Sequence, residues 1–238
     1  MVLTVHHLEN SQSLRIVWFM EELGIDYELK LYKRDLITSL APPDLKALSP
    51  LGTAPVITDD IDGVALCETN AILDYILDQP GTPQQMRPAV GTPERVDYLF
   101  FFHAGQASLG TSVSGDFIWS IVVDKVPCLV RGVLKLVYSK VRETVYEPRI
   151  ATFLDFMESK LSSSSSSSNT TTTTRDFVAG SFLTAADITL IYPVEQAFSM
   201  DPDREQKYPK CKAWLDRMYA REAHTRALDK VGEKAKIR

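Results

Sequence analysis

Apolar residues along positions 3–78 recur with two different periods. Alternation of apolar and polar residues is typical of a β-strand, and apolar residues three or four positions apart are typical of a helix. On this basis strands are predicted at 3–8, 27–32, 55–58 and 64–67, and helices at 12–23, 43–48 and 69–78. Gly24 is placed to end the first helix. The acidic turn at 59–63 joins the last two strands in a hairpin pattern.

From residue 94 onward the strand pattern fades and the helical period dominates. Helices are predicted from 94 to beyond 106, over 118–145 with interruptions at Pro127 and Gly132, and at 146–161, 184–198 and 208–220. The βαβαββα order of the first part is that of a thioredoxin-like domain. We therefore predict a thioredoxin-like α/β domain at 1–80, a Pro- and Gly-rich linker at 81–93, and an all-α helical-bundle domain at 94–238.

A tract of serine and threonine, SSSSSSSNTTTTT, interrupts the helical part between Leu161 and Arg175. Such a tract cannot bury enough apolar surface to offset its chain entropy, so a mobile loop is predicted at 162–174. A tolerated surface insertion explains it most simply, and a phosphorylation site or linker is the alternative. Runs of this kind also favour a fungal source.

The composition excludes several classes of protein. Of the 238 residues 45% are hydrophobic and 24% charged, as in an ordinary globular protein, and the net charge of -5 leaves no basic face for a nucleic acid. No apolar run reaches the ~18 residues of a membrane span, and the N-terminus enters a strand rather than a signal peptide. Three cysteines without CxxC spacing argue against a disulfide framework, so a reducing, cytoplasmic location is expected.

Two short segments carry the pattern of a binding site. Pro55 lacks an N–H, so its place before a strand implies an edge or a turn. A cis bond there would turn the Ala54 N–H and C=O toward an extended peptide backbone. Glu68 and Thr69 open a helix, where free N–H groups and the positive dipole end favour a carboxylate and Glu68 can hold an ammonium group. The two segments together predict a site for a small zwitterionic peptide.

This arrangement resembles the glutathione site of the cytosolic glutathione transferases. The resemblance covers nearly the whole chain and rests on four stretches in the family's order: HHLENSQSLRIVWFMEELGIDYELKLYKR, APPDLKALSPLG, ETNAILDYI and FVAGSFLTAADITL. Among the branches the chain looks most like the bacterial and fungal one. The resemblance implies glutathione as co-substrate, a homodimer, and binding of glutathione by Thr53, Ala54, Pro55, Glu68 and Thr69.

The resemblance also implies a hydroxyl that holds the glutathione thiolate, and Ser11 is the candidate catalytic residue. Ser11 precedes the first helix, where serine is also the commonest N-cap, so both roles are open. Asn10 is the alternative donor. His6 and His7 alternate on a strand, so we expect one to be packed and the other to lie at the surface. No HExxH or CxxC motif accompanies them, and no metal site is predicted.

Two positions depart from the family's pattern. Thr53 stands where relatives often carry Lys or Gln, whose longer side chain can reach the glycine carboxylate of glutathione. Without this hydrogen bond the binding free energy of glutathione is weaker by about 1–2 kcal/mol, unless another group supplies the contact. The candidates for that group are Lys46, Arg34 and Lys33. Ala54 replaces a larger residue, but pairing through its main chain does not depend on the side chain.

The second substrate is expected between the domains, in an apolar pocket lined by Tyr98, Phe102, Gln106, Leu109 and Trp119. The first four are spaced about one helical turn apart and would share one face of a helix. The alternative is that they form the core stripe of a helical bundle. Such a pocket would suit hydrophobic electrophiles rather than sugars or phosphates.

Thr184 and Asp187 resemble the family's helix-capping segment, so Asp187 is expected to stabilise the fold by roughly 1–2 kcal/mol or more without taking part in the reaction. The predicted function is conjugation of reduced glutathione to hydrophobic electrophiles, with glutathione peroxidase activity as a possible addition. A non-catalytic ligand-binding relative, or a glutathione-dependent lyase, etherase or isomerase, would share every motif. A glutaredoxin-like reductase is disfavoured because no cysteine lies near Ser11.

Overall fold

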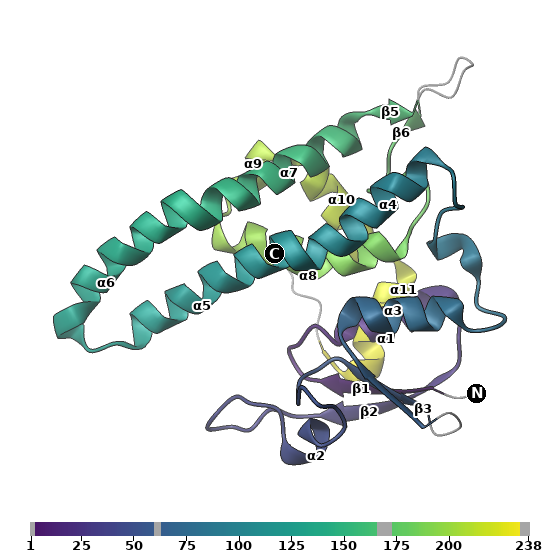
Figure 1. Cartoon of the computed structure of the whole chain (residues 1–238), viewed down its shortest axis with the longest axis horizontal. Helices are drawn as coiled ribbons and strands as arrows, with labels where there is room; N and C mark the ends of the chain where they lie inside the picture. The colour runs from purple at the N-terminus through teal and green to yellow at the C-terminus, as the bar shows by residue number, and fades with distance from the viewer. Residues whose placement is uncertain (1–2, 60–62, 166–172, 234–238) are drawn as a thin grey trace. The chain divides into compact units, whose positions relative to one another are not determined.

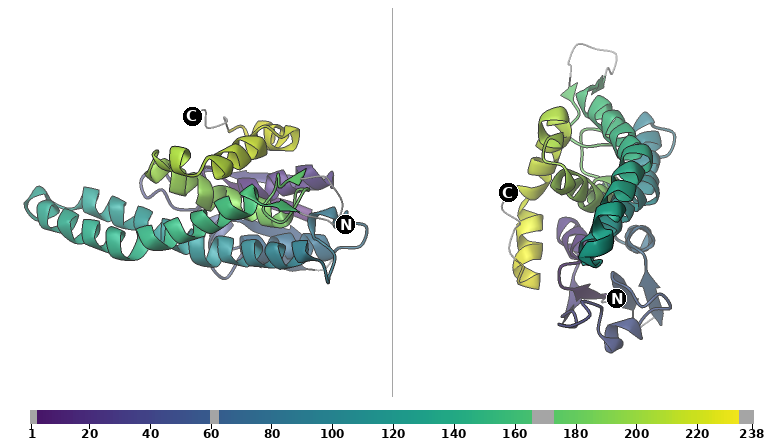
Figure 2. Two further views of the ribbon diagram at one scale, coloured as in Figure 1. Left: turned by 90° about the horizontal axis from the view of Figure 1, so that it is seen from above. Right: turned by 90° about the vertical axis from the view of Figure 1, so that its left-hand side faces the viewer.

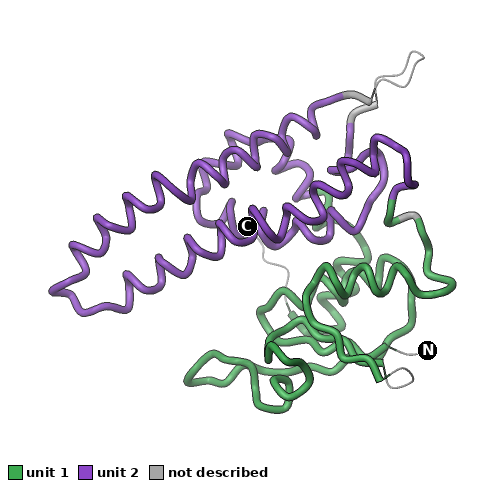
Figure 3. Tube along the Cα trace, in the orientation of Figure 1, with its two compact units in different colours: residues 1–87, 217–238 green, residues 88–216 purple. Residues whose placement is uncertain are grey.

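The computed structural model describes residues 3–59, 63–165 and 173–233, and the chain forms two compact units. Unit 1 consists of Met1–Arg87 together with Arg217–Arg238, and unit 2 consists of Pro88–Asp216 (Figure 3). The division after Arg87 falls inside the predicted linker. The C-terminal segment differs from expectation, because it belongs to unit 1 and not to the helical part.

Unit 1 is built on a four-stranded mixed sheet with the strand order β2-β1-β3-β4 (Figure 1). The strands are β1 (Leu3–Leu8), β2 (Tyr27–Tyr32), β3 (Val56–Asp59) and β4 (Val64–Cys67), which confirms the four predicted strands. β1 pairs in parallel with β2 and antiparallel with β3, and β3 pairs antiparallel with β4. Residues 60–62 of the predicted acidic turn lie outside the described residues.

The pairing register brings three segments of the chain to one end of this sheet. His6 of β1 lies opposite Val56 of β3, and Val56 lies opposite Cys67 of β4. The chain leaves β1 after Leu8, enters β3 at Val56 and leaves β4 after Cys67. Residues that follow β1, precede β3 and follow β4 are therefore neighbours at this end, which we call the site end of the sheet.

The helices of unit 1 include all three that the periodicity predicts. They are α1 (Leu14–Leu23), α2 (Pro43–Lys46), α3 (Thr69–Asp78), the short 3₁₀ turn η1 (Gln84–Met86) and α11 (Glu222–Val231). Gly24 ends α1 as expected: its φ of +64° is left-handed, and its N–H bonds the Met20 carbonyl. Helices α1 and α3 lie on the same side of the sheet in Figure 1, and α1 also packs against α11.

Helix α11 is an element that the sequence analysis did not predict. It buries an apolar face made largely of small side chains, including Ala223, Ala227 and Leu228. Its apolar positions recur with a clear helical period, but they include two alanines among many charged residues, so the segment is polar on average and the last predicted helix was ended at Ala220. This helix is capped by Gly232, and the next residue, Glu233, accepts a hydrogen bond from the Asn10 N–H. The helix therefore places Glu233 at the site end of the sheet.

Unit 2 is helical. Its elements are α4 (Pro93–Ala104), the π-helical η2 (Gly105–Gly110), α5 (Thr111–Lys125), α6 (Cys128–Val141), the π-helical η3 (Arg142–Tyr146), α7 (Glu147–Ser162), β5 (Ser164–Ser165), β6 (Thr173–Thr174), α8 (Ala185–Met200), α9 (Arg204–Lys207) and α10 (Pro209–Tyr219), whose last residues belong to unit 1. Helices α5 and α6 run side by side as a long hairpin (Figure 2).

Two predicted helix limits in unit 2 differ from the structure. Helical backbone is continuous through α4, η2 and α5, so no break separates the two helices predicted before and after residue 118. Pro127 does interrupt the second one, between α5 and α6, whereas Gly132 lies within α6 without ending it. Gly105 in the continuous helix permits close packing on α8, because a Cβ there would lie 2.9 Å from Leu190 Cδ2.

The predicted Ser/Thr loop at 162–174 is only partly described. Ser164–Ser165 and Thr173–Thr174 pair as two short antiparallel strands, which the sequence analysis did not anticipate. Residues 166–172 lie outside the described residues. None of the helices in the described part of the chain is long and apolar enough to cross a membrane.

Helix α8 starts with the predicted capping box. One carboxylate oxygen of Asp187 accepts hydrogen bonds from the backbone N–H of Thr184 at 2.9 Å and from its hydroxyl at 2.8 Å. The other oxygen accepts from the Val178 N–H at 3.0 Å and from the Trp214 indole N–H at 2.9 Å. Asp187 is fully buried, so it joins three segments of unit 2 in its core.

Candidate functional site

The site end of the sheet brings together the segments that the sequence analysis singled out. Ser11 follows β1, Ala54 and Pro55 precede β3, and Glu68 and Thr69 follow β4. Ala54 also packs against a buried cluster formed by Leu8, Leu45 and Val56, with Cys67 beside it. All of these residues belong to unit 1, so their arrangement is that of one compact unit.

The Ala54–Pro55 peptide bond is cis, the form that was considered for this position beside an edge or a turn. Pro55 is buried and Ala54 half-buried, whereas Thr53 is exposed beside them. Gly52 has a left-handed φ of +61°, and a Cβ added to it would lie 3.5 Å from Lys46 Cγ. The stem of Lys46 therefore lies along the segment that carries Thr53.

Glu68 and Thr69 occupy the start of α3. Glu68 is exposed and has a positive φ of 77°, an uncommon conformation for a residue other than glycine. Thr69 is buried, and its hydroxyl accepts a hydrogen bond at 3.2 Å from the guanidinium of Arg15, which is itself buried in α1. The start of α3 thus combines helix N–H groups with a nearby cation, a setting that favours a carboxylate ligand.

Arg15 was not predicted as a site residue. The available signal was a charged residue between the apolar Leu14 and Ile16 of a predicted helix. This signal becomes informative only when the fold buries Arg15 and places Thr69 against it.

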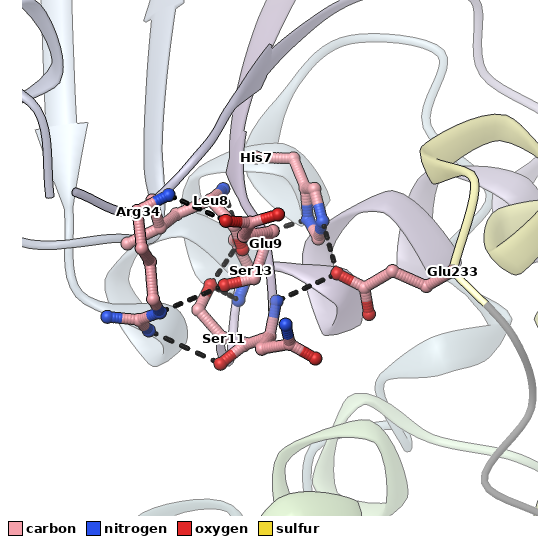
Figure 4. A network of polar contacts seen from close by, with 8 residues as sticks. His7, Leu8, Glu9, Ser11, Ser13, Arg34 and Glu233 are labelled. Atoms are coloured by element: carbon pink, nitrogen blue, oxygen red, sulfur yellow. Dashed lines mark hydrogen bonds and ion pairs between the residues drawn. The ribbon is translucent and has the colours of Figure 1, made fainter. Parts of the chain in front are cut away.

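Ser11 lies in a line of polar contacts that runs from the site end to the C-terminal segment (Figure 4). Its hydroxyl is 2.6 Å from the Ser13 hydroxyl, which is 3.0 Å from Nδ1 of His7. Nε2 of His7 is 3.0 Å from a carboxylate oxygen of Glu233, and the same oxygen accepts the Asn10 N–H at 2.9 Å. We call Ser11, Ser13, His7 and Glu233 the polar relay.

The loop that carries Ser11 is also held from the other side, by Arg34. The Arg34 guanidinium donates hydrogen bonds to the backbone carbonyls of Glu9 at 3.1 Å, Asn10 at 3.2 Å and Ser39 at 2.9 Å. Its backbone N–H donates to the Glu9 carboxylate at 2.8 Å. Arg34 therefore fixes the backbone before Ser11. Of the three candidates that the sequence offered for a carboxylate contact beside Thr53, Lys46 and Lys33 are then left.

Two expectations about this region need correction. Ser11 is not the N-cap of α1, because α1 begins at Leu14 and Ser13 is the flanking residue. Neither histidine lies at the surface: His6 and His7 are both buried, because β1 is an inner strand with both of its faces covered. His6 contacts the hydroxyls of Tyr32 and Thr58, both at 3.0 Å, on the side of β1 away from the relay.

The five residues proposed to line a substrate pocket all lie in unit 2. Tyr98, Phe102 and Leu109 are buried, and the first two stack with ring centroids 5.2 Å apart. Gln106 and Trp119 are half-buried. A cavity of about 690 Å³ in unit 2 is lined by other residues of α4, η2 and α5 together with residues of α7: Phe100, Ala107, Ser108, Thr111, Ser112, Pro148, Arg149, Thr152, Phe153 and Phe156. The pocket assignment of the five residues stays a prediction.

The three cysteines are not members of the polar relay. Cys67 is half-buried in β4, Cys128 is exposed, and Cys211 is buried, which raises the pKa of its thiol above the usual range. Among the described residues no group of three or more His, Cys, Asp or Glu side chains is arranged to hold a metal ion.

Comparison with known families gives two matches. Residues 11–79 match the N-terminal domain of glutathione S-transferase, and residues 139–222 match its C-terminal domain. Glutathione S-transferase 3 of Schizosaccharomyces pombe is 29% identical over 97% of this chain and 88% of its own length.

Two solved structures have a similar fold. The crystal structure of a glutathione S-transferase from Actinobacillus pleuropneumoniae is 26% identical, with a TM-score of 0.73 over 98% of this chain and 94% of that one. A glutathione transferase homolog from Lodderomyces elongisporus, crystallised with two GSH per subunit, is 20% identical, with a TM-score of 0.71 over 96% of this chain and 98% of that one.

Proposed function

This chain belongs to the glutathione S-transferase family, and we propose that it is an enzyme that conjugates reduced glutathione to hydrophobic electrophiles. The observation that carries the proposal is the convergence of three segments at the site end of the sheet. Ser11 would hold the thiolate, the main chain of Ala54 would pair with the cysteinyl backbone, and Glu68 and Thr69 would hold the γ-glutamyl end.

Each of these assignments has a physical basis. The γ-glutamyl group carries a carboxylate and an ammonium, which match the start of α3 and the exposed Glu68 carboxylate respectively. An extended peptide needs one N–H and one C=O of the protein to pair with, and Ala54, which precedes β3 at the site end of the sheet, can supply both from its main chain. The L. elongisporus homolog, whose structure holds GSH, supports the choice of ligand.

The reaction requires glutathione as its thiolate. A free thiol titrates near ~8.5, so only a few per cent is ionised at neutral pH. Lowering the pKa by about two units needs roughly 2.7 kcal/mol of preferential stabilisation of the anion. A hydrogen bond from Ser11 and nearby helix N-termini are the groups on hand to supply it. The thiolate would then attack the electrophile.

The test of this proposal is a pH titration of glutathione bound to the protein, followed by the ultraviolet absorbance of the thiolate. We expect the bound thiol to ionise about two pH units below free glutathione, and a hydrophobic aryl halide to be conjugated. Glutathione that binds but keeps its proton would instead favour a non-catalytic binding protein. A normal thiolate without conjugation would favour a lyase, etherase or isomerase, and turnover of an organic hydroperoxide would add peroxidase activity.

The position of Lys46 gives a prediction about glutathione affinity. Its stem lies along Gly52, beside the exposed Thr53, so its ammonium group can reach the glycine carboxylate that Thr53 is too short to contact. Lys46→Ala is expected to raise the Kd for glutathione about five- to tenfold, as for the loss of one hydrogen bond to a charged group. Isothermal titration calorimetry measures this directly. Lys33→Ala removes the other candidate lysine, which is exposed just after β2, and should leave the Kd nearly unchanged. Equal losses in the two variants, or a loss in Lys33→Ala alone, would contradict the assignment to Lys46.

The homodimer, cytoplasmic location and fungal source stay predictions. Exposed apolar side chains on α5 and α6 of unit 2 are the surface that self-association would bury; they include Phe117, Ile118, Leu129, Val133 and Leu136.

A further inference from the structure

The heavy atoms of the polar relay form an unbroken line of hydrogen bonds from Ser11 to Glu233. The successive separations are 2.6 Å between the two serine hydroxyls, 3.0 Å from Ser13 to His7 Nδ1, and 3.0 Å from His7 Nε2 to Glu233 Oε1. Ser13 is fully buried and His7 nearly so, whereas Ser11 is half-exposed at the site end. The line therefore connects the proposed thiol position to an acid–base pair inside unit 1 (Figure 4).

The positions of the protons follow from what each atom can donate. Glu233 Oε1 accepts the Asn10 backbone N–H, so this oxygen is an acceptor and the proton between it and His7 lies on Nε2. With neutral His7, Nδ1 is then an acceptor that takes the Ser13 hydroxyl proton. Ser13 Oγ accepts the Leu8 N–H at 3.0 Å and has one lone pair left, which takes the Ser11 hydroxyl proton.

The same heavy-atom positions hold a second arrangement of protons. If His7 carries a proton on both nitrogens, Nδ1 donates to Ser13, and Ser13 donates its own proton to Ser11 Oγ. The Leu8 carbonyl is the competing acceptor for Ser13, at a longer 3.3 Å. In this arrangement the Ser11 hydroxyl no longer donates its hydrogen bond to Ser13, so its proton can point to a ligand. The two arrangements differ by one shift of protons along the relay.

We propose that the polar relay takes up the thiol proton of glutathione, with His7 as the acceptor and Glu233 as the residue that positions and stabilises it. The thiol S–H bond breaks and its proton moves to Ser11 Oγ, while the Ser11 proton moves to Ser13 and the Ser13 proton moves to His7 Nδ1. The products are a thiolate that accepts a hydrogen bond from Ser11 and an imidazolium next to the Glu233 carboxylate. This inference rests on the proposed function, because it concerns the same bound thiol.

The charged side chains of α1 have other partners. Arg15 contacts Gln12 and Thr69, Glu22 contacts Trp18 and Arg221, and Glu21 contacts Tyr27, Arg226 and Lys230. Glu9 contacts Arg34, and the His224 ring of α11 contacts the rings of Trp18 and Tyr219. On the parallel neighbour β2, the residue opposite His7 is the apolar Leu31. Within the described part of the chain, Glu233 is the charged group in contact with the His7 ring.

The relay predicts a proton count that a simple hydrogen bond from Ser11 does not. Glutathione is titrated onto the full-length protein near neutral pH, the thiolate is followed by ultraviolet absorbance, and proton release is measured by calorimetry in two buffers of different ionisation enthalpy. We expect far fewer than one proton to be released for each thiolate formed, because His7 keeps it. Release of one proton per thiolate overturns the relay. Binding without any thiolate overturns the proposed function, and the relay with it.

Two variants separate the relay from a structural role of the same residues. Glu233→Gln keeps an oxygen that accepts from Asn10 and His7 but removes the charge, and we expect it to lower the thiolate fraction at neutral pH about fivefold. His7→Asn keeps a polar partner for Ser13 but cannot take up a proton, so proton release should rise to one per thiolate. Asp229→Asn makes the same change of charge at an exposed position of α11, one turn before Glu233. This variant is the control, and its thiolate fraction and proton release should match those of the parent. An unchanged thiolate fraction in Glu233→Gln refutes the relay even if His7→Asn does not fold.

Discussion

Replacing Ser11 by alanine is expected to lower kcat/KM for glutathione conjugation about 100-fold, with little change in glutathione affinity. Its hydroxyl is the half-exposed end of the polar relay, at 2.6 Å from the Ser13 hydroxyl. Loss of one preorganised donor to a developing anion typically costs about 3 kcal/mol of transition-state stabilisation. The bound thiol should also titrate closer to its free value near ~8.5. Stopped-flow turnover and the thiolate titration measure the two effects.

Asn10 provides the comparison for this prediction, since its side-chain amide is the alternative donor. Its φ of 50° is left-handed, so alanine would add backbone strain, whereas glycine removes the amide and tolerates the conformation. The backbone groups of Asn10 that bind Glu233 and Arg34 are kept in Asn10→Gly. Near-normal turnover is expected for Asn10→Gly. If this variant loses the thiolate and Ser11→Ala keeps it, the roles of the two residues must be exchanged.

The sequence was sufficient to predict the sheet and the convergence of its loops, because both depend on local signals. The four strands and the helices α1, α2 and α3 of unit 1 follow from short-range periodicity, and the place of Pro55 before a strand indicated an edge or a turn there. The register then puts Ser11, Ala54 and Glu68 at one end of the sheet without any further requirement. The residues proposed from the sequence are thus those whose expected role depends on their own loop or helix terminus.

The residues that were missed act through contacts between distant parts of the chain. His7 and Glu233 are 226 positions apart and meet only because α11 packs on α1. Ser13 had no distinguishing signal beside Ser11, and Arg15 looked like an ordinary helix residue until Thr69 was placed against it. The pairing of a buried histidine with a carboxylate over such a separation has no periodic or compositional trace, so only the folded unit reveals it.

Replacing Asp187 by alanine is expected to reduce the free energy of unfolding by about 3–5 kcal/mol, more than the cost of one helix cap. The sequence predicted the bonds to Thr184, but the structure adds donors from Val178 and Trp214 to the same buried carboxylate. Alanine leaves these buried N–H groups without an acceptor, and each such group costs about 1–3 kcal/mol. Thermal denaturation followed by circular dichroism measures the loss.

The control for Asp187 is Asp124→Ala, which removes a carboxylate from an exposed position on α5 and should change stability by less than about 0.5 kcal/mol. Trp214→Phe keeps the buried ring but removes one of the four donors, so it should cost only about 1 kcal/mol. Because Asp187 lies in unit 2 and its donors all belong to the same unit, the folded fraction of Asp187→Ala should still ionise bound glutathione normally at low temperature. A variant that melts like the parent but no longer turns over would place Asp187 in the reaction rather than in the fold.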